Sequence, residues 1–206
     1  MTRVKICGLK RDRDIDNANE LLPDYVGFVF VPGSRRYVSP ETANRLRVRL
    51  DGRIPAVGVF VNEPEEHVAR LAKDGIIQMI QLHGSEDDEY IRRLRGLTSA
   101  PIIQAFSVSS PGDAELAAAS RADFVLLDHG AGGTGEAFDW SLLSSLERPF
   151  FLAGGLTPEN VAEAIRRLRP MAVDTSSGVE TDGLKDFEKM KRFIETVRSM
   201  EPWYSF

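Results

Sequence analysis

A chain of 206 residues that is 42% hydrophobic and 28% charged has the size and composition of one globular domain covering residues 1–206. Its net charge of −5 argues against nucleic acid as a partner, and no apolar run reaches the roughly 18 residues of a membrane helix. One cysteine excludes an internal disulfide, and the charged residues near the start leave no room for a secretory signal, so we expect a cytoplasmic protein.

Strand-like and helix-like segments alternate along the chain. Strands are expected at residues 4–7, 25–30, 56–61, 76–82, 102–106, 124–127, 150–153 and 172–173. Helices are expected at 12–22, from 39–41 onward, and at 63–73, 85–97, 113–119, 140–146, 159–168 and 187–200. Ser39 before Pro40 marks the start of the second helix, and Ser85 is expected to cap the fourth.

This alternation predicts an α/β protein, because parallel strands need crossover connections that are usually helices. The strands are apolar at successive positions, as expected when helices cover both faces of a sheet. Eight units of this kind favour a compact single-domain (β/α)8 TIM barrel with eight parallel strands. An open, doubly wound sheet is the alternative fold.

Residues that can carry chemistry lie at the carboxyl ends of the predicted strands or in the loops after them. In a barrel, the carboxyl ends of the strands and the loops after them form the active site. The opposite rim shows no similar concentration of such residues. The positions at the expected site are Cys7, Arg36, Gln81, His83, Asp128, Gly154, Gly155, Asp174, Ser176, Ser177 and Gly178.

The loops after the last two strands predict a phosphate site. Gly154 and Gly155 let the backbone approach an anion, and Ser176, Ser177 and Gly178 supply hydroxyl and N–H donors. Ordinary turns are the alternative, since glycine and serine are common turn residues. An acidic chain can still hold such a local anion pocket, so we expect a phosphorylated small molecule as partner.

Residues 130–135 fit the G-x-G-x-x-G dinucleotide pattern letter for letter. That motif opens a helix inside its glycine run, whereas here the next helix begins near residue 139. No carboxylate ends the following strand, which runs from Phe150 into glycines. We therefore expect a flexible loop over the pocket instead of a nucleotide site.

Cys7 and Asp128 are candidates for a base and an acid held on separate strands. Lys5 should share the face of Cys7 and lower the pKa of its thiol, while the apolar strand before Asp128 should raise the pKa of that carboxyl. The alternatives are a buried structural cysteine and a turn-capping aspartate. Asp128 could also ligate a metal with His83 and His129, although the histidines lack metal-ligand spacing. The residues alone support a cofactor-free, metal-free proton transfer.

The number and order of these motifs resemble the phosphoribosylanthranilate isomerase family of tryptophan biosynthesis. The resemblance runs nearly from end to end of the chain. It rests on residues 5–8, 27–30, 34–37, 81–84, 127–128, 132–135, 139–140, 152–156, 174, 176–180 and 185–186.

The resemblance implies an Amadori rearrangement of N-(5-phosphoribosyl)anthranilate without a cofactor. It assigns Asp128 as the general acid, Cys7 as the general base and Arg36 as the partner of the anthranilate carboxylate. It implies that Gly154, Gly155 and the loop 176–178 bind phosphate, and that Gln81, His83 and Asp174 form the pocket floor. His129 after the acid and the aromatic segment 201–206 are less typical of the family, and that segment could cap the barrel or contact another subunit. A monomer and a homodimer both stay open.

Three other functions fit the sequence less well. The histidine-pathway sugar isomerase resembles an aspartate–aspartate pair, so Cys7 speaks against it. Indole-glycerol-phosphate synthase relies on catalytic lysines that are absent from these strand ends. A non-catalytic phosphate-ligand sensor on the same barrel would need neither Cys7 nor Asp128.

Overall fold

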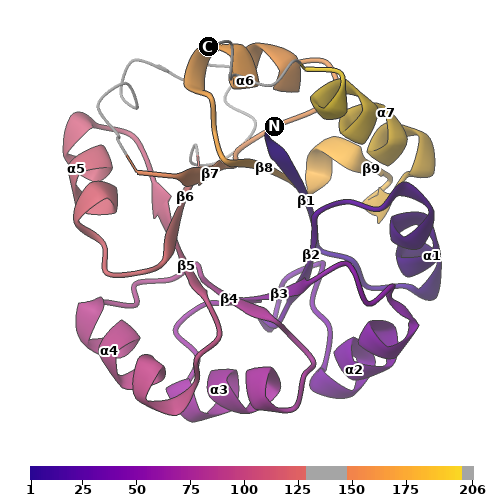
Figure 1. Ribbon diagram of the computed structural model, residues 1–206. Coiled ribbons are helices and arrows are strands. Elements are labelled where there is room, and N and C mark those ends of the chain that lie inside the picture. Colours follow the sequence, from indigo (N-terminus) through magenta and orange to yellow (C-terminus); the bar gives the residue numbers. More distant parts are fainter. Residues whose placement is uncertain (129–147, 201–206) are drawn as a thin grey trace.

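The strands close into a ring in the computed structural model, which describes residues 1–128 and 148–200 (Figure 1). The strands of the ring are parallel, and each pairs with its neighbour in the chain, while β1 also pairs with β8. The α/β barrel is therefore confirmed, and the open sheet is excluded. The strands are β1 Arg3–Cys7, β2 Tyr25–Val29, β3 Ala56–Phe60, β4 Met79–Leu82, β5 Ile102–Ser107, β6 Phe124–Asp128, β7 Phe150–Leu152 and β8 Ala172–Thr175.

Helices surround this ring on the outside (Figure 1). They are α1 Asp12–Leu21, α2 Pro40–Arg49, α3 Glu65–Lys73, α4 Asp88–Leu97, α5 Pro111–Ala119, α6 Val161–Leu168 and α7 Phe187–Arg198. The predicted helix at 140–146, the glycine run 130–135, His129 and the segment 201–206 lie outside the described residues. Within the described residues, no helix is long and apolar enough to cross a membrane.

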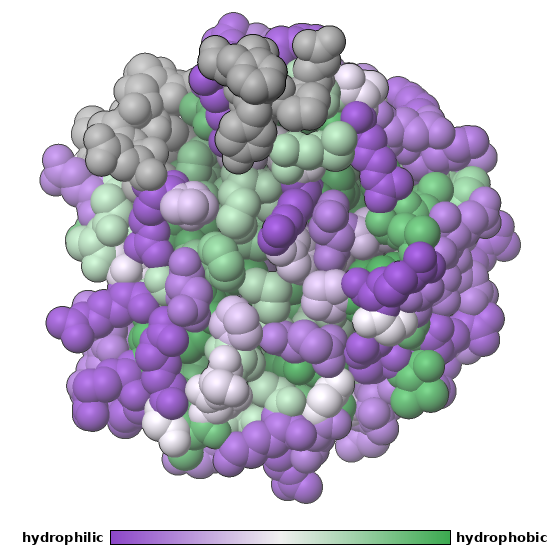
Figure 2. Space-filling model, viewed as in Figure 1, coloured by the Kyte–Doolittle hydropathy of each residue, from purple (hydrophilic) through white to green (hydrophobic). Residues whose placement is uncertain are grey.

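Alternate residues of each strand serve two separate cores. Val4 and Ile6 of β1 belong to the large cluster between the barrel and its helices. The inner cluster contains Val57, Leu126 and Phe151 from three different strands. This division explains why the strands are apolar at successive positions. On the face seen in Figure 2, hydrophilic residues dominate the outer ring, and more hydrophobic ones show toward the centre.

Two local expectations of the sequence are corrected. Ser39 caps α2 as predicted, but α4 begins after Asp87, whose carboxylate accepts from the backbone N–H of Tyr90. Ser85 instead donates to Asn62 on the neighbouring loop. The fourth strand begins at Met79 and not at residue 76, because the amides of residues 76 and 77 bond back to the carbonyl of Leu71 and close the end of α3.

A hairpin between β8 and α7 was not predicted. One 3₁₀ turn, η2 Ser177–Val179, leads into the short antiparallel strands β9 Glu180–Thr181 and β10 Leu184–Lys185. The hairpin lies beside the carboxyl end of β8, because the Lys185 ammonium donates to the Ser176 carbonyl at 2.9 Å. Its turn is Asp182–Gly183, whose φ values are both positive, 52° and 73°, so this Asp-Gly pair is the signal in the sequence that could have found the hairpin.

Candidate active site

A pocket of about 610 Å³ opens at the carboxyl ends of the strands. Every site residue predicted from the sequence lines it, together with Ser34, Ala153, Leu156, Thr175 and four valines at the ends of β2 and β3 or just after them. The fold therefore brings together residues that are as much as 171 positions apart.

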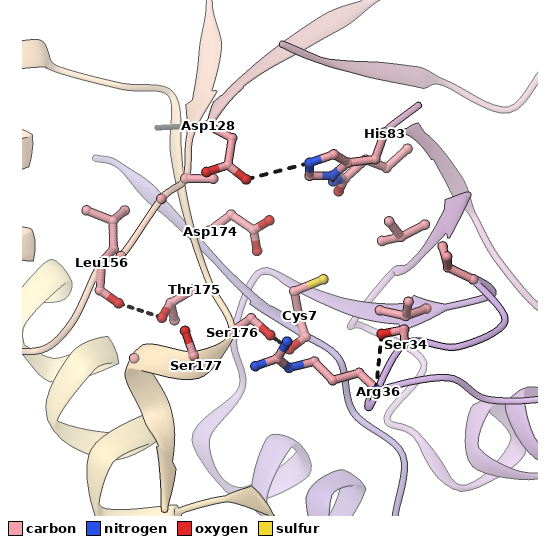
Figure 3. A pocket seen from close by; sticks show the side chains of 18 of the residues that line it. Cys7, Ser34, Arg36, His83, Asp128, Leu156, Asp174, Thr175, Ser176 and Ser177 are labelled. Atoms are coloured by element: carbon pink, nitrogen blue, oxygen red, sulfur yellow. Dashed lines mark hydrogen bonds and ion pairs between the residues drawn. The ribbon is translucent and has the colours of Figure 1, made fainter. Parts of the chain in front are cut away.

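Cys7 ends β1 with its side chain in the pocket and only 8% of the residue exposed (Figure 3). Gly27 lies opposite it on β2, and a Cβ at that position would sit 2.6 Å from the Cys7 sulfur. A glycine is therefore required there to leave space for the thiol. The Cys7 carbonyl accepts a 3.0 Å hydrogen bond from the Ser176 hydroxyl, which ties the ends of β1 and β8 together.

The expected lowering of the Cys7 pKa is wrong. Burial raises the pKa of the thiol above its ordinary value, the positive charge of Lys5 lowers it, and Asp174 raises it again. Lys5 does lie on the inner face as predicted, fully buried, but its ammonium donates a 2.8 Å hydrogen bond to Asp174. The charge of Lys5 is shared with that carboxylate, so it cannot offset the desolvation of the thiol.

Two buried acceptors face the floor of the pocket without a partner among the described residues: Oδ1 of Asp174 and Oε1 of Gln81. The other carboxylate oxygen of Asp174 is held by Lys5, and the amide nitrogen of Gln81 donates to Nδ1 of His83 at 3.0 Å. Buried acceptors of this kind need donors, which hydroxyl groups of a ligand can supply. Burial raises the pKa of Asp174, and the attraction of Lys5 offsets only part of that rise.

Asp128 is the last residue of β6. Its Oδ2 lies 3.6 Å from Nε2 of His83. Figure 3 shows this pair on one side of the pocket and Cys7 on the other, with Asp174 between them. The Asp128 side chain is 31% exposed, so the described residues do not provide the apolar enclosure expected for it. A proton donor and a base on opposite sides of a bound molecule can act on two different atoms of it.

Arg36 reaches the pocket from the loop after β2. Its side chain lies against Gly8, whose φ is +83° and where a Cβ would come within 2.4 Å of Cδ of Arg36. The guanidinium donates from Nε and Nη2 to both carboxylate oxygens of Glu180 at 2.8 Å. Lys185 is bonded to the same carboxylate at 2.6 Å. Sequence reasoning placed Arg36 in the site and missed Glu180 and Lys185.

The loops after β7 and β8 form one connected rim. The hydroxyl of Thr175 donates to the Leu156 carbonyl at 2.7 Å, and a Cβ on Gly178 would lie 1.9 Å from that same oxygen. Gly154 and Gly155 have φ values of +93° and +63°, which only glycine adopts readily. Both loops predicted to bind phosphate therefore meet at close range, in backbone conformations that their glycines permit.

A metal centre finds no support in the described part of the chain. Among residues 1–128 and 148–200, no group of three or more His, Cys, Asp and Glu side chains is arranged to hold a metal ion. His129, which the metal alternative also required, lies outside the described residues.

The closed ring and the pocket at the carboxyl ends of its strands define a (β/α)8-barrel enzyme that takes a small ligand. Residues 4–196 match the model of the N-(5'phosphoribosyl)anthranilate (PRA) isomerase family. The chain belongs to this family, whose members are isomerases of tryptophan biosynthesis.

Individual relatives support the same assignment over the full length. The chain is 45% identical to the N-(5'-phosphoribosyl)anthranilate isomerase of Endomicrobium trichonymphae, with 97% of this chain and 100% of the relative covered. The crystal structure of phosphoribosyl anthranilate isomerase from Thermotoga maritima is 42% identical with a TM-score of 0.89, covering 97% of this chain and all of the other. A phosphoribosyl anthranilate isomerase in complex with reduced 1-(o-carboxyphenylamino)-1-deoxyribulose 5-phosphate is also 42% identical, with a TM-score of 0.87 and the same coverage.

Proposed function

We propose that the protein converts N-(5'-phosphoribosyl)anthranilate to 1-(2-carboxyphenylamino)-1-deoxyribulose 5-phosphate by an Amadori rearrangement. The observation that carries this proposal is the placement of Cys7 and Asp128 on opposite sides of one pocket. A ligand named for both a carboxyl and a phosphate group occupies a family structure, which fits a pocket that has an arginine and two glycine-rich loops. The reaction is a proton transfer within one molecule, so side chains suffice and no cofactor is needed.

In this mechanism Asp128 donates its proton to the ring oxygen of the ribose. The bond between that oxygen and C1 then breaks, and the lone pair of the anthranilate nitrogen forms a protonated Schiff base. The positive nitrogen acidifies the C2 proton, which Cys7 removes as the general base. The resulting enolamine tautomerises to the ketone.

The remaining pocket residues are proposed to bind the substrate. Arg36 pairs with the anthranilate carboxylate, because a guanidinium matches the geometry of a carboxylate. The loops holding Gly154, Gly155, Ser176, Ser177 and Gly178 bind the phosphate. Asp174 and Gln81 have the unpartnered buried acceptors that sugar hydroxyls can satisfy, and His83 completes the floor beside Asp128. The reaction belongs to a cytoplasmic pathway.

The test follows anthranilate fluorescence, with the substrate made in situ from anthranilate and phosphoribosyl pyrophosphate. Wild type should consume the fluorescence, and Cys7→Ala and Asp128→Asn should each lower kcat by at least about 100-fold, which is typical for loss of a general base or acid. Both variants should still bind the reduced product analogue. A wild type that binds this analogue but leaves the fluorescence unchanged would contradict the proposal and indicate a phosphate-ligand sensor.

A further inference from the structure

We propose that Glu180 is a positioning residue for the substrate's carboxylate: it fixes the guanidinium of Arg36 so that one edge of it faces the pocket. This inference rests on the proposed function, because it refines how the carboxylate of that substrate is held. Glu180 lies on β9 in the unpredicted hairpin, 144 residues from Arg36 in sequence.

A guanidinium has two edges that can pair with a carboxylate through two parallel N–H donors. The edge of Nε and Nη2 on Arg36 is taken by the two oxygens of Glu180, each at 2.8 Å. Among the described residues, no hydrogen bond from Nη1 is found, while Arg36 lines the pocket. The edge of Nη1 and Nη2 is therefore the one available to a ligand, and Glu180 determines where it points.

The aliphatic stem of Arg36 packs against Gly8, apart from the contacts of its guanidinium. A Cβ added to Gly8 would lie 2.4 Å from Cδ of Arg36, so this part of the side chain lies against the loop between β1 and α1. A long side chain anchored only at its stem would still sample several rotamers, and ordering it on binding would cost conformational entropy. The pairing of the Arg36 guanidinium with Glu180 restricts these rotamers before the ligand binds.

Lys185 makes the arrangement of charges favourable for an anion. Its ammonium, with 1% of the side chain exposed, bonds to Glu180 at 2.6 Å and to the Ser176 carbonyl at 2.9 Å. Two cations and one anion leave a net positive charge in the cluster of Arg36, Glu180 and Lys185. Glu180 can therefore orient Arg36 without cancelling the attraction for a carboxylate. The bond to Ser176 also connects this cluster to the predicted phosphate loop.

The cluster differs from the surface ion pairs of this chain. Arg92 and Glu89 on α4, for example, have side chains that are 66% and 52% exposed, and such pairs contribute little to structure. The Glu180 side chain is only 9% exposed. Burial raises its pKa, but the bonds from Arg36 and Lys185 outweigh this and lower the pKa to about 2. Glu180 is thus held as an anion at neutral pH.

The apolar residues beside Arg36 suggest that the carboxylate belongs to an aromatic or other apolar group. Val29 and Val59 pack around Cys7, with Val31 partly buried against them, and all of them line the pocket. A carboxylate directly attached to a flat apolar ring would place the ring on these valines while its charge meets Arg36. This is the chemistry of a benzoate, as in the proposed substrate.

The experiment compares two ligands that differ only in this carboxylate. One is reduced 1-(o-carboxyphenylamino)-1-deoxyribulose 5-phosphate, and the other is its counterpart without the ring carboxylate. Their dissociation constants are measured by calorimetry for wild type, Glu180→Gln, Arg36→Met and the double variant. Glu66→Gln, on an exposed position of α3, is the matched control for loss of one negative charge.

We expect Glu180→Gln to weaken binding of the carboxylate ligand by about tenfold, because the orientation of a charge-assisted pair is lost. Binding of the second ligand should change less than about twofold, and Glu66→Gln should change neither. In the Arg36→Met background, Glu180→Gln should have no further effect on either ligand. In turnover, the loss should appear in KM with kcat nearly unchanged, since the contact is present before and during the reaction.

The direction in which Glu180→Gln changes the binding affinity distinguishes a positioning role from a purely electrostatic effect of its charge. Removing a negative charge should by itself strengthen anion binding, so tighter binding of both ligands to Glu180→Gln would overturn the positioning role. An equal loss for both ligands would overturn it too, since that pattern reports general damage to the pocket. If wild type neither turns over the substrate nor distinguishes the two ligands, the proposed function itself fails.

Discussion

The Lys5 ammonium and the Asp174 carboxylate form a 2.8 Å ion pair inside the barrel, at the level just below Cys7. The two residues pair in register on β1 and β8, so the contact also spans the joint that closes the ring. Burial lowers the pKa of Lys5, but Asp174 and Cys7 outweigh this and raise it, so the lysine is charged. The pair supports the floor of the pocket and links the stability of the fold to its chemistry.

Replacing Lys5 by methionine should destabilise the protein by about 3–5 kcal/mol, because it leaves the Asp174 carboxylate buried without its partner. Denaturation in urea measures this loss, and Lys73→Met on an exposed position of α3 provides the control. The loss should shrink at acidic pH, where Asp174 takes up a proton. The double variant Lys5→Met with Asp174→Leu should recover part of the stability. If Lys5→Met has the same free energy of unfolding as Lys73→Met, the pair does not stabilise the fold.

The reactivity of Cys7 should increase with pH well into the alkaline range. Burial raises the pKa of this thiol, so less than half of it is ionised at pH 8.5, the ordinary pKa of a thiol being about 8.5. The rate of alkylation by iodoacetamide reports it directly, since the chain has one cysteine and Cys7→Ala provides the unlabelled control. The kcat/KM profile should rise over the same range if Cys7 is the base. A rate that levels off below pH 8 would show that the thiol is not perturbed in this direction.

Gly27→Ala should disturb Cys7 without changing any charge. The added Cβ would lie 2.6 Å from the Cys7 sulfur and 3.1 Å from its Cα, so the strand or the thiol must shift. We expect a destabilisation of about 1–3 kcal/mol from overpacking, together with a large fall in kcat. Gly96→Ala on α4, where the Cβ meets nothing within 4 Å, should instead stabilise by about 0.5–1 kcal/mol. Thermal unfolding and the fluorescence assay together separate the two outcomes.

Glu180 should contribute stability that depends on pH in one direction. Its pKa is about 2 in the folded protein, against about 4.3 for a glutamate in an unfolded chain. The unfolded state therefore binds the proton first as pH falls, and the contribution is complete above about pH 5 and lost between there and pH 2. The difference in unfolding free energy between wild type and Glu180→Gln should follow this course in urea titrations. A difference that stays constant down to pH 3 would contradict it.

The sequence predicted the barrel because its signals are local and repeated. Apolar strands, capping residues such as Ser39 and the position of Cys7 at the end of β1 can all be recognised from near neighbours. The same logic placed Lys5 on the inner face, since side chains alternate along a strand. The site residues followed from the strand ends alone, and the structure collects them in one pocket.

What the sequence could not provide depends on contacts between distant segments. The pKa of Cys7 was predicted in the wrong direction because burial raises it most, and because Asp174, 167 residues further on, shares the charge of Lys5. Glu180 was missed because it follows a strand end by a whole turn and acts through Arg36, 144 residues away. Ser85 was chosen as a cap by type, although Asp87 has the carboxylate at the position where α4 begins. The first two errors come from partners that are distant in sequence, whereas Asp87 is only two residues from Ser85.

Closure of the ring has a consequence for how the protein is made. Every strand pairs with the strand before it in the chain, except at the joint between β1 and β8. The ribosome releases β1 first, so the strand that holds Lys5 and Cys7 has one unpaired edge until β8 has been synthesised. During that interval both edges can pair with other chains, which makes the growing barrel dependent on protection from aggregation. A chain that stops before Asp174 would lack the partner of Lys5 and the loop of Ser176–Gly178, so the pocket is completed only at the final stage of synthesis.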